Sequence, residues 1–347
     1  MGPWSTPAAI TPPGAGRPNS PIAAAIHDRH GAFQTFYVRP DGAVGSALQV
    51  GGHWRSNAIT QPGLVHGESP LAIFRLGDGD SRIWVAFFAP DGSLSVMLER
   101  PWTDSVMLEK PWKETTDIAL NTYVPAGNGT GLVAAGYLRR DEWHAFYQAT
   151  TGALVDFPGR VSSKYGWGLP LQIAPPGMAR PQSPIAVLAR GDGQLHVFFV
   201  RHDGAVATTW SEWRDGRQQW GAPFTITPPG VARADSALAA VLRGRELHVF
   251  YVGPDGALAT TWAAGPWQVH WAVGAWQTPF PITPPGAAGP GSRMAAVVRR
   301  DQLHVFYQGP DGALATNWAV GPWQRSFPIT PPGAGRPSSS IAVVTGR

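Results

Sequence analysis

The chain has 347 residues, and its 42 glycines and 35 prolines are about twice the average share of a globular protein, which excludes a helical bundle. Since 43% of the residues are hydrophobic and 11% are aromatic, the chain can still bury a large core. The net charge is only +4 and the basic residues are dispersed, so we expect no nucleic-acid partner. The absence of cysteine excludes disulfides and cysteine-bound metals.

The sequence also lacks the signals of a membrane or secretory protein. No apolar run reaches the roughly 18 to 20 residues of a membrane span, and the first residues show no charged region followed by an apolar stretch. We therefore expect a soluble protein, either cytoplasmic or released without a conventional signal.

A repeat runs along the whole chain. Its clearest copy is residues 247–262, and each copy contains a turn dipeptide that is Asp-Gly in five cases and Thr-Gly in one. A period near 50 residues with such turns is typical of a β-propeller, in which each repeat forms one four-stranded blade. The turn glycines, one per copy, are Gly42, Gly92, Gly152, Gly204, Gly256 and Gly312.

The strands of one unit follow from the pattern of the residues. Residues 237–242 are small and apolar and suit the crowded propeller axis, while 247–252 and 257–262 alternate on either side of the Asp-Gly turn. A fourth strand is expected between a tryptophan and a proline pair, as from Trp276 to Pro284, because a proline pair cannot donate ladder hydrogen bonds and must close an edge strand. The sequence thus predicts an all-β propeller of four-stranded blades.

The two ends of the sequence are near copies of each other. Residues 321–335 nearly repeat residues 2–16, so the chain holds six periods and an overlap. We favour six blades, with seven as the alternative, and expect segments 1–16 and 333–347 to take part in ring closure. A ten-residue duplication within 95–112 predicts a protruding hairpin in the second repeat. The six repeats cover approximately 17–62, 63–125, 126–176, 177–229, 230–285 and 286–332.

The repeat resembles the blades of β-propeller lectins, both the six-bladed fucose-specific family and the seven-bladed Photorhabdus-type family. The shared pattern is a small apolar strand, Leu-x-Val-Phe-Tyr, a turn, Gly-x-Leu and then Trp. In the six-bladed family, an Arg of the second strand and a Glu of the third bind the sugar between blades. Here the Arg position holds Gln34, Trp84, His144, His196, His248 and His304. The Glu position holds Ser46, Val96, Asp156, Thr208, Thr260 and Thr316, so no blade has both family residues.

The residues at these positions still suit a ligand with many hydroxyl groups. Imidazole and hydroxyl groups donate and accept hydrogen bonds, and an indole face stacks on the apolar side of a sugar ring. We predict ligand-binding triplets in the last three repeats and a further His-Asp pair in the third. The candidates are His196, Thr208 and Trp210; His248, Thr260 and Trp262; His304, Thr316 and Trp318; and His144 with Asp156.

Other interpretations remain open. The triplets could be packing residues that were copied with the repeat. The chain could be a protein-interaction scaffold that binds through residues 95–112, or an enzyme with one asymmetric site in the first three repeats. We favour a multivalent lectin that binds glycans, without a cofactor, metal or catalytic residue, because the acidic residues lie mostly in turns and the histidines recur once per repeat. The sequence does not decide the oligomeric state.

Overall fold

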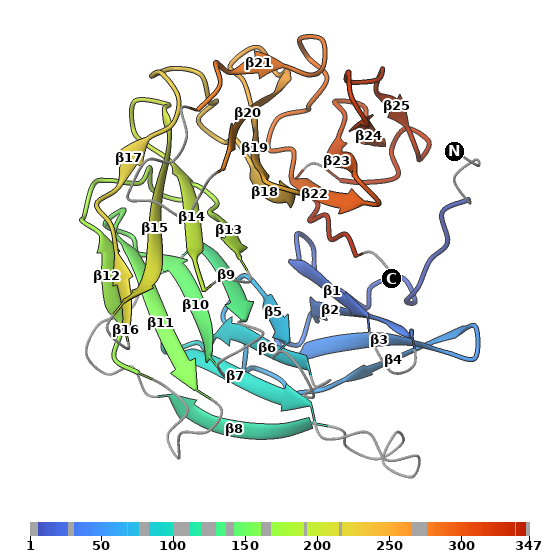
Figure 1. Ribbon diagram of the computed structural model, residues 1–347. Helices are drawn as coiled ribbons and strands as arrows, with labels where there is room; N and C mark the ends of the chain where they lie inside the picture. The colour runs from blue at the N-terminus through green and yellow to red at the C-terminus, as the bar shows by residue number, and fades with distance from the viewer. Residues whose placement is uncertain are drawn as a thin grey trace.

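The computed structural model describes residues 6–26, 31–67, 69–75, 83–99, 112–118, 130–136, 142–160, 168–190, 193–214, 217–265, 276–336 and 338–344. Within these ranges the chain is all-β and contains no helix. The strands form six antiparallel sheets arranged around an axis as the blades of a propeller (Figure 1). The predicted fold class and the favoured number of blades are confirmed.

Each blade is a meander, with its strands numbered from the axis outwards. The first three blades contain β1 (Ile22–Ile26), β2 (Phe33–Val38), β3 (Val44–Val50) and β4 (His53–Ala58); β5 (Ala72–Arg75), β6 (Ile83–Phe88), β7 (Leu94–Glu99) and β8 (Trp112–Ile118); and β9 (Thr130–Gly136), β10 (Glu142–Gln148), β11 (Leu154–Arg160) and β12 (Leu171–Ala174).

Blade 4 has an additional outer strand, since β16 and β17 both pair with β15. The last three blades contain β13 (Ala186–Ala189), β14 (Leu195–Val200), β15 (Val206–Arg214), β16 (Arg217–Trp220) and β17 (Phe224–Thr225); β18 (Leu238–Arg243), β19 (Glu246–Val252), β20 (Leu258–Ala264) and β21 (Phe280–Pro281); and β22 (Met294–Arg299), β23 (Gln302–Gln308), β24 (Leu314–Ala319) and β25 (Phe327–Pro328).

The outer strands of blades 4 to 6 are shorter than the sequence suggests. We expected strands running from Trp220, Trp276 and Trp323 to the following proline pairs, but β17, β21 and β25 have two residues each. Prolines within these segments, such as Pro281 and Pro328, remove donors from the ladder. Near the tryptophan, a main-chain bond joins this segment to the third strand, for example from the Gln277 N–H to the Trp262 carbonyl at 2.9 Å.

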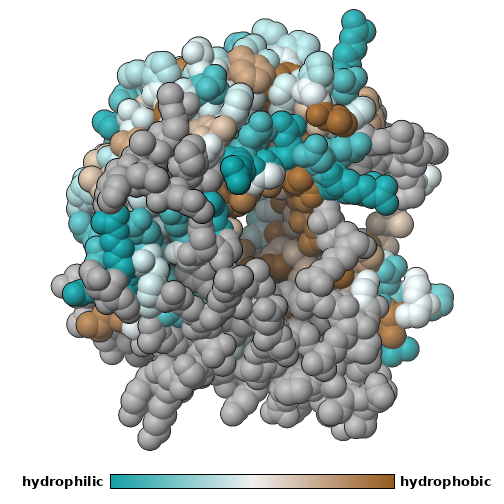
Figure 2. Space-filling view, in the orientation of Figure 1, coloured by the Kyte–Doolittle hydropathy of each residue, from teal (hydrophilic) through white to brown (hydrophobic). Residues whose placement is uncertain are grey.

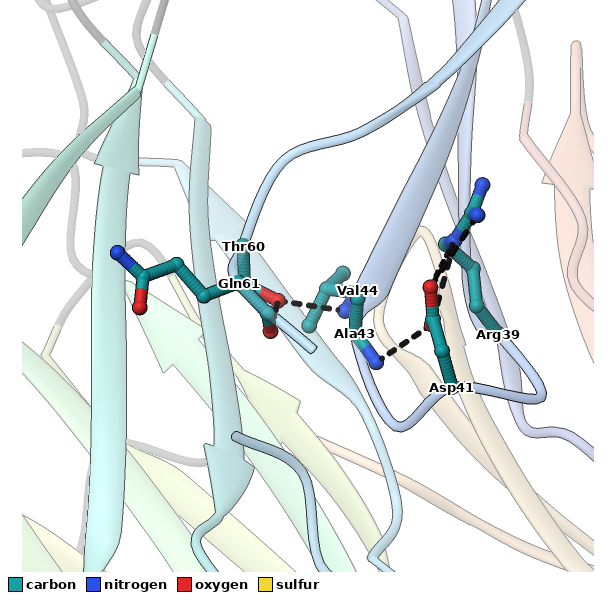
Figure 3. A network of polar contacts seen from close by, with 6 residues as sticks. All are labelled: Arg39, Asp41, Ala43, Val44, Thr60 and Gln61. Carbon is teal, nitrogen blue, oxygen red and sulfur yellow. Dashed lines mark hydrogen bonds and ion pairs between the residues drawn. The ribbon is translucent and has the colours of Figure 1, made fainter. Parts of the chain in front are cut away.

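The six predicted turns have the expected geometry. All six turn glycines have φ between 76° and 81°, the left-handed region that glycine adopts without strain. In five turns the preceding aspartate also accepts a main-chain hydrogen bond, as Asp41 does from Ala43 at 3.1 Å (Figure 3). Arg39 forms an ion pair with Asp41 at the surface. These contacts explain why the turn dipeptide recurs.

In blades 1, 4, 5 and 6, a threonine two residues before a Pro-Gly dipeptide fixes the outer strand to the third strand. The hydroxyl oxygen of Thr60 accepts a hydrogen bond from the Val44 N–H at 2.8 Å and donates to the Gln61 carbonyl (Figure 3). Thr227, Thr283 and Thr330 repeat the first contact in blades 4, 5 and 6. These hydroxyls accept hydrogen bonds from main-chain N–H groups of the third strand that have no partner on the outer strand.

The core consists of interfaces between blades. We call the face of a blade that packs on the following blade its trailing face, and the face that packs on the preceding blade its leading face. Phe250 lies on the trailing face of blade 5, and Leu303, Val305 and Tyr307 lie on the leading face of blade 6. Phe198 and Phe250 are fully buried and Phe306 nearly so, as the sequence predicts. Within the described residues, five hydrophobic clusters join successive blades from 1/2 to 5/6.

The terminal segments 1–16 and 333–347, which we expected in ring closure, lie outside the sheets as far as the structure describes them. Residues 6–16 and 341–344 form no strand, and β1 and β25 complete blades 1 and 6 from within the chain. Ring closure by the termini therefore stays a prediction. Most of the predicted protruding hairpin, residues 100–111, lies outside the described residues.

Candidate functional site

Each of the last three blades carries a column of stacked rings on the trailing face of its central hairpin. The strand register places His248 opposite Trp262 and Phe250 opposite Thr260. The His248 ring lies 5.9 Å from the Trp262 ring and 6.2 Å from the Phe250 ring, nearly parallel to both. Blades 4 and 6 have the same arrangement, with His196 and Trp210 at 6.2 Å and His304 and Trp318 at 6.3 Å. The structure thus brings the predicted triplets together.

The members of a triplet differ in exposure. The histidines are buried, and Trp210 is 6% exposed, whereas Trp262 and Trp318 are partly exposed. Thr208, Thr260 and Thr316 are fully buried, and their hydroxyls donate to main-chain carbonyls of the second strand, as Thr260 does to Val249 at 3.1 Å. The indole rings of Trp262 and Trp318 are therefore the accessible part of these columns.

A polar cluster that the sequence analysis missed lies next to His248 in the column of blade 5. Glu246 accepts hydrogen bonds from Arg243, at 3.0 Å from Nε, and lies 3.2 Å from His248 Nε2. All three side chains share the trailing face, because Arg243 is paired with Glu246 and His248 lies two residues further along β19. The signal for this cluster was the recurrence of Arg and Glu or Gln shortly before each His.

The same cluster recurs with glutamine in the neighbouring blades. In blade 4, Arg190 donates to Gln194 at 2.7 Å, two residues before His196. In blade 6, Gln302 lies 3.3 Å from His304 Nε2. Blade 5 therefore has the one carboxylate among these three equivalent positions.

Burial keeps the histidines of the columns neutral. Burial and the charge of Arg190 lower the pKa of His196 to about 3. Burial also lowers the pKa of His248, although the hydrogen bond to Glu246 opposes this shift, and it lowers the pKa of His304. Partial burial acts to raise the pKa of Glu246, but bonds from Arg243 and His248 outweigh it and leave this pKa below its usual value. At neutral pH the cluster of blade 5 thus contains a carboxylate, a guanidinium and a neutral imidazole.

Blade 3 has a different column. His144 Nδ1 lies 2.9 Å from Asp156 Oδ1, and both side chains are 2% exposed. The indole N–H of Trp220, from blade 4, donates to Asp156 Oδ2 at 3.2 Å, and the Trp220 ring packs edge-on against Phe146. The predicted pair is therefore formed, but it is enclosed between blades 3 and 4.

The first two blades lack the column. In blade 1, Gln34 donates to Ser46 at 2.8 Å in a buried contact. In blade 2, Trp84 stacks on Trp143 of blade 3, with ring centres 6.4 Å apart, and Val96 is buried in the same cluster. Polar, partly exposed columns are thus a feature of blades 4 to 6.

In blades 4 and 5, a tryptophan of the following blade packs on the phenylalanine of the column. Trp276 packs edge-on against Phe198 at 6.2 Å, and Trp323 packs against Phe250 at 5.7 Å. The candidate site of blade 5 therefore borders the interface with blade 6, where Trp323 packs on Phe250.

The described residues contain neither a cluster of metal ligands nor a membrane-spanning helix. No group of three or more His, Asp or Glu side chains within them could hold a metal ion. No helix in the described part of the chain is long and apolar enough to cross a membrane.

Comparisons with known proteins identify similar folds. No family model matches the chain, and no curated protein matches it. The BP39L lectin from Burkholderia pseudomallei has a structure that superposes with a TM-score of 0.78 at 26% identity, covering 93% of this chain and 88% of that one. The chain is similar to β-propeller lectins.

Two further structures support the same fold at lower identity. AofleA from Arthrobotrys oligospora matches with a TM-score of 0.60 at 16% identity, covering 94% of this chain and 91% of that one. The Aleuria aurantia lectin, described as a six-bladed β-propeller with a novel fucose recognition mode, matches with a TM-score of 0.57 at 18% identity over 93% of this chain and all of that one. The predicted resemblance to β-propeller lectins is confirmed.

Proposed function

We propose that this protein is a carbohydrate-binding lectin with a site at the rim between blades 5 and 6. The observation that carries the proposal is the partly exposed indole of Trp262, stacked on His248 beside the Arg243–Glu246 ion pair. An indole face next to fixed donors and acceptors is the chemistry that recognises the apolar and hydroxyl-bearing sides of a sugar ring.

The groups of the site have distinct roles in this proposal. The Trp262 ring supplies the stacking surface, the Glu246 carboxylate accepts hydrogen bonds from sugar hydroxyls, and the Arg243 guanidinium donates them. His248 is buried beneath the Trp262 ring and holds the Glu246 carboxylate in place through its Nε2. The Thr260 hydroxyl donates to the Val249 carbonyl and so joins the two strands of the hairpin. The similarity to lectins of known structure favours a glycan ligand over other ligands with hydroxyl groups.

Blades 4 and 6 supply weaker versions of the site. Their positions equivalent to Glu246 hold Gln194 and Gln302, which are neutral, and Trp210 of blade 4 is largely buried. We expect weak binding at each site and stronger binding to glycans displayed on a surface, because linked sites gain from effective concentration.

The experiment is a glycan array on the full chain, followed by calorimetric titration with the best sugar. We expect Trp262→Ala to remove the site of blade 5, and the joint substitution of Trp210, Trp262 and Trp318 by alanine to abolish binding to glycan-coated beads. Trp54→Ala, at a partly exposed position on β4, is the matched control and should bind as the wild type does. A folded triple variant that still binds, or a wild type that binds no glycan, would falsify the proposal.

A conservative substitution tests the carboxylate. Glu246→Gln installs the residue of blades 4 and 6, so we expect weaker binding at the blade 5 site without loss of the fold. Equal affinity in this variant would show that the carboxylate does not contact the ligand.

A further inference from the structure

Arginines gather at one end of the ring, on the hairpins that join the first and second strands of blades 4, 5 and 6. They are about one repeat apart in the sequence and look dispersed there, but every such hairpin lies at the same end because the six blades share one meander. Among the described residues of these three hairpins, the acidic residues are Glu246 and Asp301. The arginine cluster consists of Arg190, Arg243, Arg245, Arg299 and Arg300.

The two arginines in the turns are accessible to a ligand. Arg245 and Arg300 are both exposed, and each lies beyond the end of an innermost strand. Arg300 has φ of 55°, the left-handed region in which blade 5 has Gly244 at 59°. Blade 6 thus presents a charged side chain at a backbone position that favours glycine.

The charge of the arginine cluster reaches the histidine columns. Burial is the first cause that lowers the pKa values of the three histidines, and in each blade an arginine of the cluster lowers the pKa further. The pairs are Arg190 with His196, Arg243 with His248, and Arg299 with His304. Because a guanidinium group stays protonated at neutral pH, this end of the molecule is positive at all three blades.

The opposite end of the ring has a different charge pattern. Its exposed arginines are paired with nearby aspartates, as Arg39 is with Asp41 and Arg201 is with Asp203. The other aspartates of the Asp-Gly turns lie at that end too, since these turns join the second and third strands. Figure 2 shows strongly hydrophilic residues beside the opening of the ring, where Figure 1 places β18 and β22.

We propose that the arginine cluster binds an anionic polysaccharide, a chain whose sugar units carry carboxylate or sulfate groups. The inference rests on the proposed lectin function and extends it from one sugar to a chain. Arg243 belongs to the cluster and also to the site of blade 5, so a chain with one unit on Trp262 continues along the β18–β19 hairpin to Arg245. Guanidinium groups bind such anionic groups through two parallel hydrogen bonds.

A polysaccharide fits this surface better than duplex nucleic acid does. Duplex DNA carries one charge per about 1.7 Å of its axis and is bound by an extended basic surface. Here the arginines are spread over three blades, with Glu246 and Asp301 among them. The partly exposed indole of Trp262 beside the cluster adds a stacking surface for a sugar ring.

The probe is a fluorescently labelled oligogalacturonate, with heparin as the sulfated chain and dextran as the neutral one. We expect the full chain to bind both anionic probes, with affinity that falls as the salt concentration rises from about 50 to about 300 mM, and not to bind dextran. The double variant Arg245→Gln/Arg300→Gln should weaken this binding by about tenfold. The matched control Arg39→Gln/Arg201→Gln removes the same charge at the opposite end and should bind as the wild type does.

Trp262→Ala tests whether the chain also occupies the site of blade 5. We expect this variant to bind oligogalacturonate more weakly while keeping the salt dependence of the wild type. Unchanged binding in Trp262→Ala, or equal losses in the two double variants with thermal melts like that of the wild type, would overturn the proposal. Tighter binding of duplex DNA or of anionic lipid vesicles through Arg245 and Arg300 would overturn the choice of a polysaccharide.

A neutral sugar separates this inference from the proposed lectin function. The best neutral sugar from the glycan array should titrate Arg245→Gln/Arg300→Gln as it titrates the wild type, because these two side chains lie outside the single-sugar site. A wild type that binds no neutral sugar counts against the lectin function. A wild type that binds neutral sugars but no anionic chain counts against the arginine cluster alone.

Discussion

Blades 5 and 2 use the same hairpin for different purposes. Both have a tight turn with a left-handed glycine, Gly256 and Gly92, and both bury the trailing face of their hairpin against the next blade. In blade 5 this face carries His248, Phe250 and Trp262, with charged groups at its rim, whereas in blade 2 it carries Trp84, Ala86 and Val96.

The difference teaches that the scaffold and the candidate site are separable. The turn, the main-chain ladder and the leading face are common to both blades and define the propeller. The trailing face can be filled with polar rings or with apolar side chains, provided that the next blade packs on it. A ligand site can therefore exist in some blades and be absent from others of the same fold.

The largest expected effect comes from making blade 5 more like blade 2 at one position. Phe250 of blade 5 corresponds to Ala86 of blade 2, so Phe250→Ala gives both blades alanine at this position. In blade 2 the stacked rings of Trp84 and Trp143 fill the space beside the alanine, and blade 5 has no such pair. Because Phe250 is fully buried, we expect a loss of roughly 3 to 5 kcal/mol in the free energy of unfolding, measured by denaturant titration. Val320→Ala, at a position that is 53% exposed, should be near wild type. A stable Phe250→Ala variant would mean that the interfaces repack freely.

The buried pair of blade 3 should be the next most sensitive. Asp156→Asn removes the charge that faces His144 and leaves one acceptor oxygen where the carboxylate offers two, to His144 and to the Trp220 N–H, and we expect it to cost roughly 3 kcal/mol. Asp301→Asn, at an exposed position, is the control for the same chemical change. If both variants unfold at the same denaturant concentration, blade 3 tolerates the loss of its polar column.

Acid should destabilise the blades with histidine columns. The pKa of His196 is lowered to about 3 in the folded protein, so below pH 6.5 the unfolded chain binds a proton that the folded chain does not. Stability should therefore fall as the pH falls from 6.5 towards 3, by about 1.4 kcal/mol per pH unit for this group. His196→Gln, the residue of blade 1 at Gln34, should reduce this dependence in denaturant titrations at several pH values, while His53→Gln at an exposed position should not.

The smallest expected effect concerns a contact that blades 1, 4, 5 and 6 share. Thr283→Val removes the hydroxyl that accepts the Leu258 N–H and leaves a buried donor unsatisfied, at a cost of about 1 to 2 kcal/mol. Thr278→Val, at an exposed position five residues earlier, should have no measurable effect on the thermal melt. A neutral Thr283→Val would show that water can replace this hydroxyl.

The sequence by itself determined the propeller, because its evidence is repetitive and local. An Asp-Gly turn requires a left-handed glycine wherever it occurs, and alternation around it assigns faces to the two strands without knowledge of the neighbours. His248 and Trp262 could thus be assigned to adjacent strands of one hairpin, and the structure places them opposite each other.

What only the tertiary structure decided is how the blades meet. Whether a threonine such as Thr260 faces a ligand or a carbonyl depends on packing between strands, and here its hydroxyl is used by the Val249 carbonyl. The ion pair of Arg243 and Glu246 and the exposed ring of Phe33 depend on what the adjacent blade covers, because burial of a side chain at a blade face is set by the next blade and not by its own repeat. A repeat pattern specifies one blade at a time, and the interfaces between blades decide which side chains of each blade are buried.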